Sequence, residues 1–456
     1  MSELPSVPAS ADPVDDGLVA VTGTVSQPQP LPEIENEDAR NERTFFRARL
    51  LRKVRHFIGD NGPLAVMLTV VFMNLVGFGI IVPLMPFFAQ SLGAAPFAAT
   101  APWMVTLMFA TYSLGQFFAE PFCGRLSDRI GRKPILLITT ALSMVFYICL
   151  ALTQNIWLAI LVRFFSGMAS GNISTIQGYV SDVSKPEQRT ARLGLVGAAF
   201  SLGFIIGPFI GGILAKAHGT ARPFELPLFV AAGMSGLAAL GVLFFVKESR
   251  QRKVTSQVQP NLYKTAVEGF RTPAIRNVIL TSLGYMAAFA GLEATFAMWT
   301  SLRFHWDAQK VGNIFPIIGV TAALMQTVIM RPLVRRWGEA KVLAAGLFFF
   351  GLSFIVQSFN GIEWLITPIV VMGTMGQAVI FVSICAIISH ATPPDRQGAM
   401  LGLNMSTGAM ARITGPVAGG LLFGLSPEAP LWMGALLTMP AALLALRVGR
   451  LQKRSV

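Results

Sequence analysis

The stretch GRLSDRIGRKP, Gly124 to Pro134, decides how this chain can be arranged. Apolar runs flank it on both sides, so it reads as a short charged turn between two helices. Gly124 and Gly131 suit a tight turn and close helix approach, and Asp128 can pair with an arginine or cap a neighbouring helix. Four further residues would hold the turn at a membrane surface and begin the next helix: Arg129, Arg132, Lys133 and Pro134.

The composition is that of a membrane protein. Of the 456 residues, 53% are hydrophobic and 13% are charged, whereas soluble proteins carry about a quarter charged residues. The net charge of +13 would suggest nucleic acid for a soluble chain, but here the basic residues fall in short loops. The three cysteines show neither disulfide-framework numbers nor metal-ligand spacing. We therefore expect no metal, no cofactor and no nucleic-acid partner.

Apolar stretches of spanning length recur along the chain. They lie near residues 64–88, 101–122, 134–153, 156–179, 191–215, 226–246, 277–300, 309–331, 340–358, 363–389, 398–424 and 430–447. With both termini inside, nearly every basic loop residue falls on the cytoplasmic side, as the positive-inside rule requires. The opposite side holds Lys216, Arg222, Arg303 and Lys310. The pattern predicts an all-α integral membrane protein with twelve transmembrane helices.

An internal repeat divides these helices into two sets of six. PEQRTARLGL with GPFIGG, within 186–212, matches PDRQGAMLGL with GPVAGG, within 394–420, at an offset of 208 residues. Parallel repeats place a substrate site at their interface, near the bilayer midplane. We expect two pseudo-symmetric six-helix bundles. The expected boundaries are a disordered tail over 1–60 with a basic juxtamembrane end, a first bundle over 61–246, a linker over 247–275, a second bundle over 276–448 and a cytoplasmic tail over 449–456.

The 124–134 turn resembles the signature loop of the major facilitator superfamily. Its second-half counterpart, RPLVRRWGEAK from Arg331 to Lys341, is degenerate, because Arg336 stands where an aspartate is expected. The resemblance implies the major facilitator fold and an inner gate in which the turn cooperates with Asp182. The partner we expect for Asp182 is a cytoplasmic arginine such as Arg129 or Arg189.

Helix 191–215 resembles the antiporter motif of that superfamily. Small residues at three- and four-residue spacing give a smooth helix face, and a proline permits a kink. The residues are Gly203, Gly207, Pro208, Gly211 and Gly212. Drug:proton exporters carry this motif, and simple close packing is the alternative. Arg163, in RFFSGMASG, resembles an arginine that takes part in proton coupling in the family, with a purely structural role as the alternative.

Few other ionisable groups lie within the apolar stretches. A carboxyl in a low-dielectric cavity can load and release a proton near neutral pH. Glu293, well inside its helix, is the first candidate for the proton carrier. The alternative is an interhelical hydrogen bond or a pairing with Arg412 or Arg163. Glu120 is a second candidate, or a structural residue tied to the loop that follows it.

The first helix, NLVGFGIIVPLMPFF, is similar to that of twelve-span tetracycline exporters. Two residues depart from those exporters: Asn74 stands in place of an acid, and Arg412 lies where a small or apolar residue is expected. The residues expected to line the substrate cavity are Asn74, Met108, Tyr112, Gln116 and Asn172.

These observations predict a monomeric, proton-coupled exporter of small amphipathic or cationic compounds, a drug antiporter of antibiotic-resistance type. Its expected place is the bacterial cell inner membrane. The alternatives are an exporter or symporter of sugars or anionic metabolites, and a transport-inactive sensor or scaffold. An enzyme is not expected, since the sequence shows no catalytic triad, metal cluster or phosphate loop.

Overall fold

The computed structural model describes residues 62, 64–93, 102–185, 188–216, 224–249, 267, 269–393 and 396–452. The tail expected over 1–60 lies outside these residues, and so do most of the linker over 247–275 and residues 453–456.

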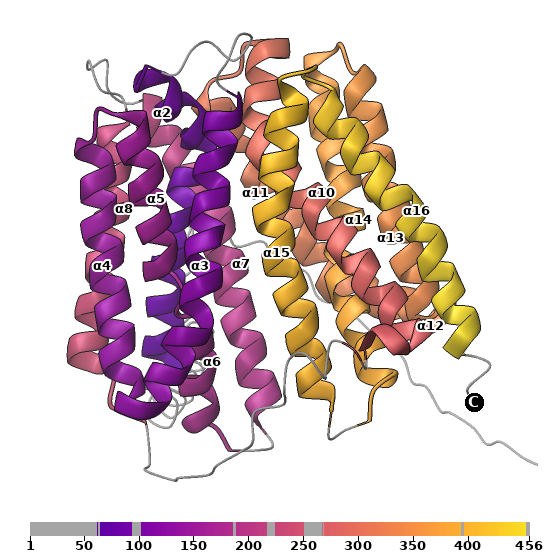
Figure 1. Cartoon of the computed structure of the whole chain (residues 1–456), viewed down its shortest axis with the longest axis horizontal. Helices are drawn as coiled ribbons and strands as arrows, with labels where there is room; N and C mark the ends of the chain where they lie inside the picture. The colour runs from indigo at the N-terminus through magenta and orange to yellow at the C-terminus, as the bar shows by residue number, and fades with distance from the viewer. Residues whose placement is uncertain are drawn as a thin grey trace, which may run out of the picture. The chain divides into compact units, whose positions relative to one another are not determined.

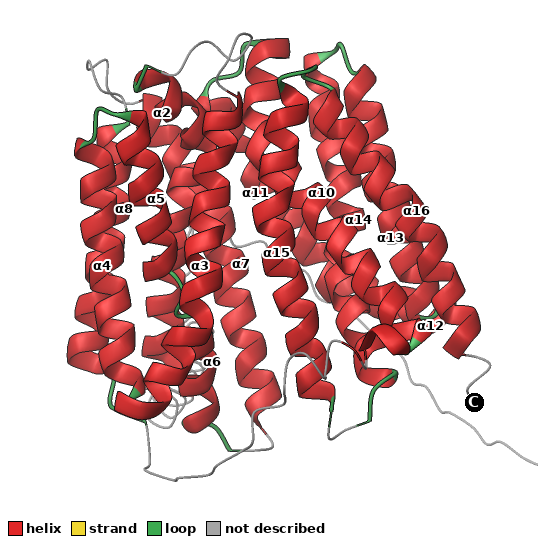
Figure 2. Cartoon of the chain, in the orientation of Figure 1, coloured by secondary structure: helices red, strands yellow, loops and turns green. Residues whose placement is uncertain are grey.

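The described part of the chain is built from helices and contains no strand (Figure 2). Residues 64–81 form a helix that leads into a 3₁₀ turn. The elements that follow in chain order are η1 (Val82–Leu84), α2 (Met85–Ser91), α3 (Pro102–Ile130), α4 (Arg132–Leu152), α5 (Ile156–Ala169), α6 (Ile173–Asp182), α7 (Arg189–Lys216), α8 (Glu225–Phe245), α10 (Pro273–Phe304), α11 (Ala308–Leu324), η3 (Met325–Ile329), α12 (Met330–Trp337), α13 (Glu339–Phe359), η4 (Glu363–Leu365), α14 (Ile366–His390), α15 (Gln397–Phe423) and α16 (Ala429–Gln452).

The expectation of an all-α membrane protein is confirmed. Among the described residues, ten helical runs have the length and hydropathy needed to cross a bilayer. Helices α3 and α15 contain 29 and 27 residues but are not among these ten. They pack against each other, and a face turned towards another helix or a cavity needs less apolar surface than one turned towards lipid. The count of twelve crossings stays a prediction.

Three of the expected spans are interrupted. The first helix passes through the 3₁₀ turn Val82–Leu84, which carries Pro83 and is followed by Pro86. The fourth breaks at residues 170–172, between α5 and α6. The eighth contains the π-helical turn Met325–Ile329 between α11 and α12. Proline explains the first break, whereas the π turn has no proline or glycine of its own.

Two contacts related by the repeat join the two sets of helices. Helix α7 packs on α11, and α15 packs on α3 (Figure 1). A Cβ added at Gly212 would lie 2.8 Å from the Ala308 carbonyl oxygen, which is too close for a side chain to fit without movement of the backbone. At the position 208 residues later, Gly420 lies against Thr106. Both contacts are near the ends of α7 and α15 and near the starts of α11 and α3, so they lie at the end of the bundle away from Gly131.

Near their other ends, the same two helices carry glycines whose positions are open. A Cβ added at Gly194 or Gly197, near the start of α7, would meet no atom within 4 Å. The same is true of Gly402, near the start of α15 and the repeat equivalent of Gly194. The two sets of helices are therefore tightly joined at the Gly212 end, whereas these glycines meet no neighbouring atom at the end that carries the Gly131 turn.

Gly212→Val should separate α7 from α11 and lower stability. The added side chain would meet backbone atoms of α11, which cannot move aside as a flexible side chain can. Overpacking of this kind typically costs about 1–3 kcal/mol. Thermal denaturation of the purified protein would measure the effect. Gly197→Val, on the same helix but in open space, is the matched control; an equal loss of stability in both variants would contradict the assignment.

Candidate functional site

Two glycines allow α3 and α5 to cross at unusually short distance. A Cβ added at Gly115 would lie 2.9 Å from the backbone nitrogen of Met168, and one added at Gly167 would lie 3.0 Å from the Cα of Tyr112. Only a residue without a side chain fits at such a crossing. The close approach brings Arg163 of α5 directly against α3.

Arg163 is buried, with 1% of its surface exposed. Its guanidinium carbon lies 4.3 Å from the ring centroid of Tyr112, a cation–π distance. Its Nε–H donates to the Met108 carbonyl oxygen at 3.4 Å, while Nη1 has no hydrogen-bond partner among the described residues. No carboxylate in that part of the chain forms an ion pair with Arg163. Such an arrangement is costly inside a membrane and is typical of a functional group.

A second arginine lies among carboxylates from both halves of the chain. Arg412 of α15 is exposed, and its charge interacts with Glu293 of α10 and with Glu120 of α3. Arg163 also interacts with Glu293, more weakly. Neither arginine makes a direct ion pair with Glu293, although all three side chains are described. Arg412 thus interacts with a carboxylate from each half, Arg163 interacts with Glu293, and Tyr112 interacts with Arg163, Arg412 and Glu120.

Glu120 has a different neighbour from the one suggested by the sequence. The interpretation that ties it to the following basic loop has no counterpart among its described contacts, where its charged neighbour is Arg412. Its backbone carbonyl accepts a hydrogen bond from the Ser174 hydroxyl at 3.1 Å, which joins α3 to α6. The Glu120 side chain is half-buried. Together with Glu293, Arg163 and Arg412 it forms what we call the charged cluster.

The five residues expected to line a substrate cavity differ in their accessibility. Gln116 is half-buried, whereas Asn74, Met108, Tyr112 and Asn172 are buried. The amide of Asn172 donates to the Thr139 hydroxyl at 3.0 Å, so it ties the break between α5 and α6 to α4. In this conformation Gln116 is the one of the five that is accessible.

The glycines of the antiporter motif serve two different contacts. Gly203, Gly207 and Gly211 lie against the first helix; a Cβ added at Gly207 would be 2.7 Å from the Val76 carbonyl oxygen. Gly212 instead faces α11, as described above. Pro208 lies within a continuous α7 and packs against Gly79 of the first helix. The motif therefore fixes one pair of helices within the first half and one contact between the halves.

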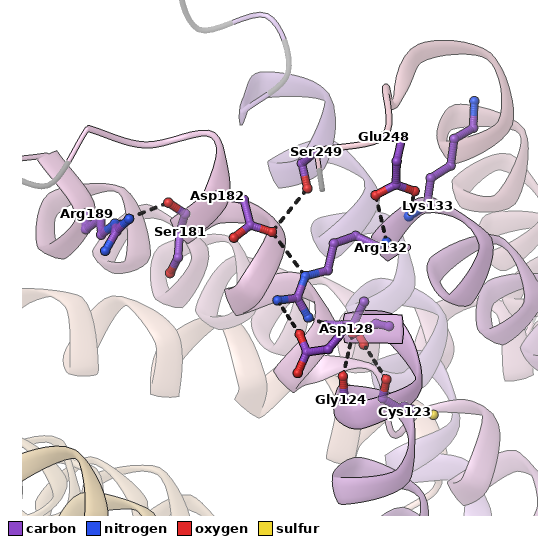
Figure 3. Close-up of polar contacts among 12 residues, drawn as sticks. Cys123, Gly124, Asp128, Arg132, Lys133, Ser181, Asp182, Arg189, Glu248 and Ser249 are labelled. Atoms are coloured by element: carbon purple, nitrogen blue, oxygen red, sulfur yellow. Dashed lines mark hydrogen bonds and ion pairs between the residues drawn. The ribbon is translucent and has the colours of Figure 1, made fainter. Parts of the chain in front are cut away.

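The turn at Gly131 carries an ordered polar network (Figure 3). Arg132 is at its centre: Nη2 pairs with Asp128 at 2.7 Å and Nε with Asp182 at 3.2 Å. Its Nη1 donates to the Ser127 hydroxyl at 2.6 Å. Arg132 is therefore a cytoplasmic arginine that pairs with Asp182, although the sequence suggested Arg129 or Arg189 as examples. The Nε–H of Arg189 donates to the Ser181 carbonyl oxygen.

Sequence reasoning missed Glu248, which completes this network from the segment after α8. Its two carboxylate oxygens accept the backbone N–H groups of Arg132 and Lys133 at 2.8 and 3.1 Å. Gly131 precedes these residues with a φ of +115°, and a Cβ there would run into the carboxylate. Glu248 thus caps the start of α4, the role considered for Asp128. Its separation in sequence, 116 residues from Arg132, hides the contact.

The second-half counterpart of the turn is built differently. Gly338 has a positive φ of +77°, like Gly131, but Arg336 is exposed. The cross-helix contact is made by His390 and Glu339, with Nδ1 and Oε2 3.1 Å apart. At the repeat offset of 208 residues, His390 is the equivalent of Asp182. The acid of the first half is replaced by a group that is charged only when protonated.

Comparison with known proteins identifies a matching family and similar resistance proteins. Residues 67–331 and 278–455 match the sequence profile of the Major Facilitator Superfamily. The class C tetracycline resistance protein of Escherichia coli is 27% identical over 389 residues, which is 84% of this chain and 95% of that protein. The quinolone resistance protein NorA of Staphylococcus aureus (strain MRSA252) is 25% identical over 367 residues, or 80% and 90% of the two chains.

Solved structures share the fold. The human organic anion transporter MFSD10 (TETRAN) superposes with a TM-score of 0.62 at 21% identity, over 85% of this chain and 99% of its own. An inward-facing, occupied structure of a bacterial homologue of the lysosomal transporter Spinster gives 0.68 at 11% identity, over 85% and 96%. With the helical architecture described above, these matches show that this multi-pass membrane protein is not an enzyme and belongs to the Major Facilitator Superfamily.

Proposed function

We propose that this chain is a proton-coupled exporter of small amphipathic or cationic compounds that works by alternating access. The observation that carries the proposal is the cluster of Glu120, Glu293, Arg163 and Arg412, because it joins ionisable groups of both halves in a membrane interior. The similarity of this chain to tetracycline and quinolone resistance proteins supports a drug-like substrate. The expected place is a bacterial inner membrane, with a single chain as the working unit.

The packing of α7 and α15 supports alternating access. Their contacts with α11 and α3 close the end away from the Gly131 turn, while the glycines at their other ends meet no neighbouring atom. If the basic Gly131 end is cytoplasmic, as the loop charges predict, the structure is an inward-open state. Export then requires the Gly131 end to close and the Gly212 end to open.

Arg412 provides a link between the two halves that a proton can change. It shares the second half with Glu293 but interacts with Glu120 across the interface. A rocking motion of the halves changes the distance from Arg412 to Glu120 more than its distance to Glu293. Protonation of a carboxylate removes its attraction for Arg412, so it shifts the balance between the two states. A cationic substrate would compete for the same carboxylates.

The network around Arg132 is the proposed inner gate. It ties α3, α4, α6 and the start of the linker into one unit through Asp128, Asp182 and Glu248. Such a unit can move as one body when the Gly131 end closes. The single ion pairs are partly exposed and individually weak, so the strength of the unit comes from several contacts that share one arginine.

Glu293→Gln should abolish proton-driven accumulation of substrate while leaving substrate binding and membrane insertion intact, because glutamine keeps the shape but cannot exchange a proton. We expect a loss of roughly a hundredfold or more, the range typical of general acid–base groups. Proteoliposomes with an imposed pH gradient would measure it. Glu363→Gln is the control: it changes an exposed carboxylate in the short turn before α14 and should leave transport active. Undiminished accumulation by the Glu293 variant would exclude Glu293 as the carrier.

Arg412→Gln should shift transport towards cations, because it removes a positive charge that interacts with two carboxylates. The measurement is the ratio of uptake of a cationic to an anionic fluorescent dye in everted vesicles. We expect this ratio to rise several-fold, and Arg447→Gln, an exposed residue at the end of α16, to leave it unchanged. Faster transport of the anionic dye by the wild-type protein would favour the anionic-solute alternative.

Glu248→Ala should loosen the gate by exposing two backbone donors at the start of α4. Loss of a helix cap typically costs about 0.5–2 kcal/mol. Hydrogen exchange at the first turn of α4 should accelerate, and transport should fall. Lys247→Ala, at the neighbouring exposed position, is the control. Unchanged exchange in the Glu248 variant would show that the cap does not hold this turn.

A further inference from the structure

We infer that a groove between α12 and α14 binds one anionic phospholipid of the adjacent leaflet. The groove has a volume of about 520 Å³, and its apolar wall is formed by Met330, Val334, Val382 and Ala386. It lies on the second half, formed by different residues from the charged cluster, and it is independent of the proposed export function.

The wall of the groove is apolar and continuous with a packed core. Met330 is buried with Met325, Ala378 and Val379 in one hydrophobic cluster, and Val334 packs on it. Val382, by contrast, is 41% exposed. The groove therefore has a firm floor and an open apolar side, which suits an acyl chain better than a polar solute.

The rim of the groove is positive. Arg331 and Arg335 line it, both are exposed, and their spacing of four residues places them on the same face of α12. The remaining charged lining residue is Glu339, whose carboxylate is engaged by His390 at 3.1 Å. Arg336 and Lys341, also exposed at this end of the chain, add to the positive charge. Two guanidinium groups match the oxygen atoms of one phosphate.

The arginines of the groove lie near the end of a helix that is long and apolar enough to span a bilayer, where a phospholipid headgroup is expected. Arg331 precedes Trp337, the end of its span, by six residues, or about 9 Å along a helix. Trp337 is 49% exposed, as expected for an aromatic side chain at the membrane interface. Val382 lies eight residues before the end of the span that finishes at His390, so the apolar wall extends further into the bilayer than the arginines do.

Native mass spectrometry of the full chain in detergent, titrated with phosphatidylglycerol, would test this site. We expect one molecule to bind roughly tenfold to thirtyfold more tightly to the wild-type protein than to the double variant Arg331→Gln/Arg335→Gln. Val382→Trp, which fills the open side but keeps every charge, should also weaken binding. Thermal denaturation would verify that each variant is folded.

Two comparisons separate a built site from general attraction. Arg271→Gln/Arg276→Gln removes two other exposed arginines and should leave phosphatidylglycerol binding unchanged. Phosphatidylcholine and inorganic phosphate should bind far more weakly than phosphatidylglycerol. Equal weakening by both double variants would overturn the proposal in favour of a diffuse positive surface. Binding of inorganic phosphate as tight as that of the lipid, or no effect of Val382→Trp, would overturn the acyl-chain part and with it the lipid site.

Discussion

The arrangement of this transporter depends on backbones that touch where side chains are missing. Lipid supplies no hydrophobic force between helices, so close packing must hold them together, and small residues permit it. Helix α7 carries such residues on two faces: Gly207 lies against the carbonyl of Val76, while Gly212 meets α11. The first contact fixes a helix pair within one half. The second joins the halves at one end, and its repeat equivalent, Gly420 against Thr106, closes the same end on the other side.

The same constraint explains where the charges are. The crossing at Gly115 and Gly167 is so close that Arg163 is buried under the ring of Tyr112. A buried cation without a carboxylate partner destabilises the fold that holds it, so packing elsewhere must offset it. Arg412 of α15 differs from Arg163 in both respects. It is exposed, and its charge interacts with two carboxylates, one from each half. One arginine is fixed and the other is free to respond.

Much of the fold could be predicted because its signals are local or periodic. Spanning length is set by neighbouring residues, and the 208-residue repeat is visible as two similar stretches of sequence. Ten of the expected spans correspond to apolar helices that the structure describes. The contacts that no local signal carries were not predicted. Glu248 caps α4 across more than a hundred residues, and Asp182 finds Arg132 although Arg189 is closer in sequence. The π turn at Met325–Ile329 contains no proline or glycine that would mark it in the sequence.

The roles expected for single residues follow the same division. The motif glycines could be identified from their spacing and from their resemblance to the antiporter motif, because small residues at this spacing permit close helix packing. Asn172 is expected to line a cavity, and in this conformation its amide donates to the Thr139 hydroxyl. The turns at Gly131 and Gly338 show that a repeated backbone turn does not determine the side-chain contacts around it. Arg132 binds Ser127, Asp128 and Asp182 at once, whereas the corresponding turn of the second half has a contact between Glu339 and His390. Because the backbone turn with its positive φ recurs in both halves, the fold requires the turn and not the network. The network around Arg132 belongs to the first half. In the second half, the corresponding region at the end of α12 forms one side of the groove to which we assign a phospholipid.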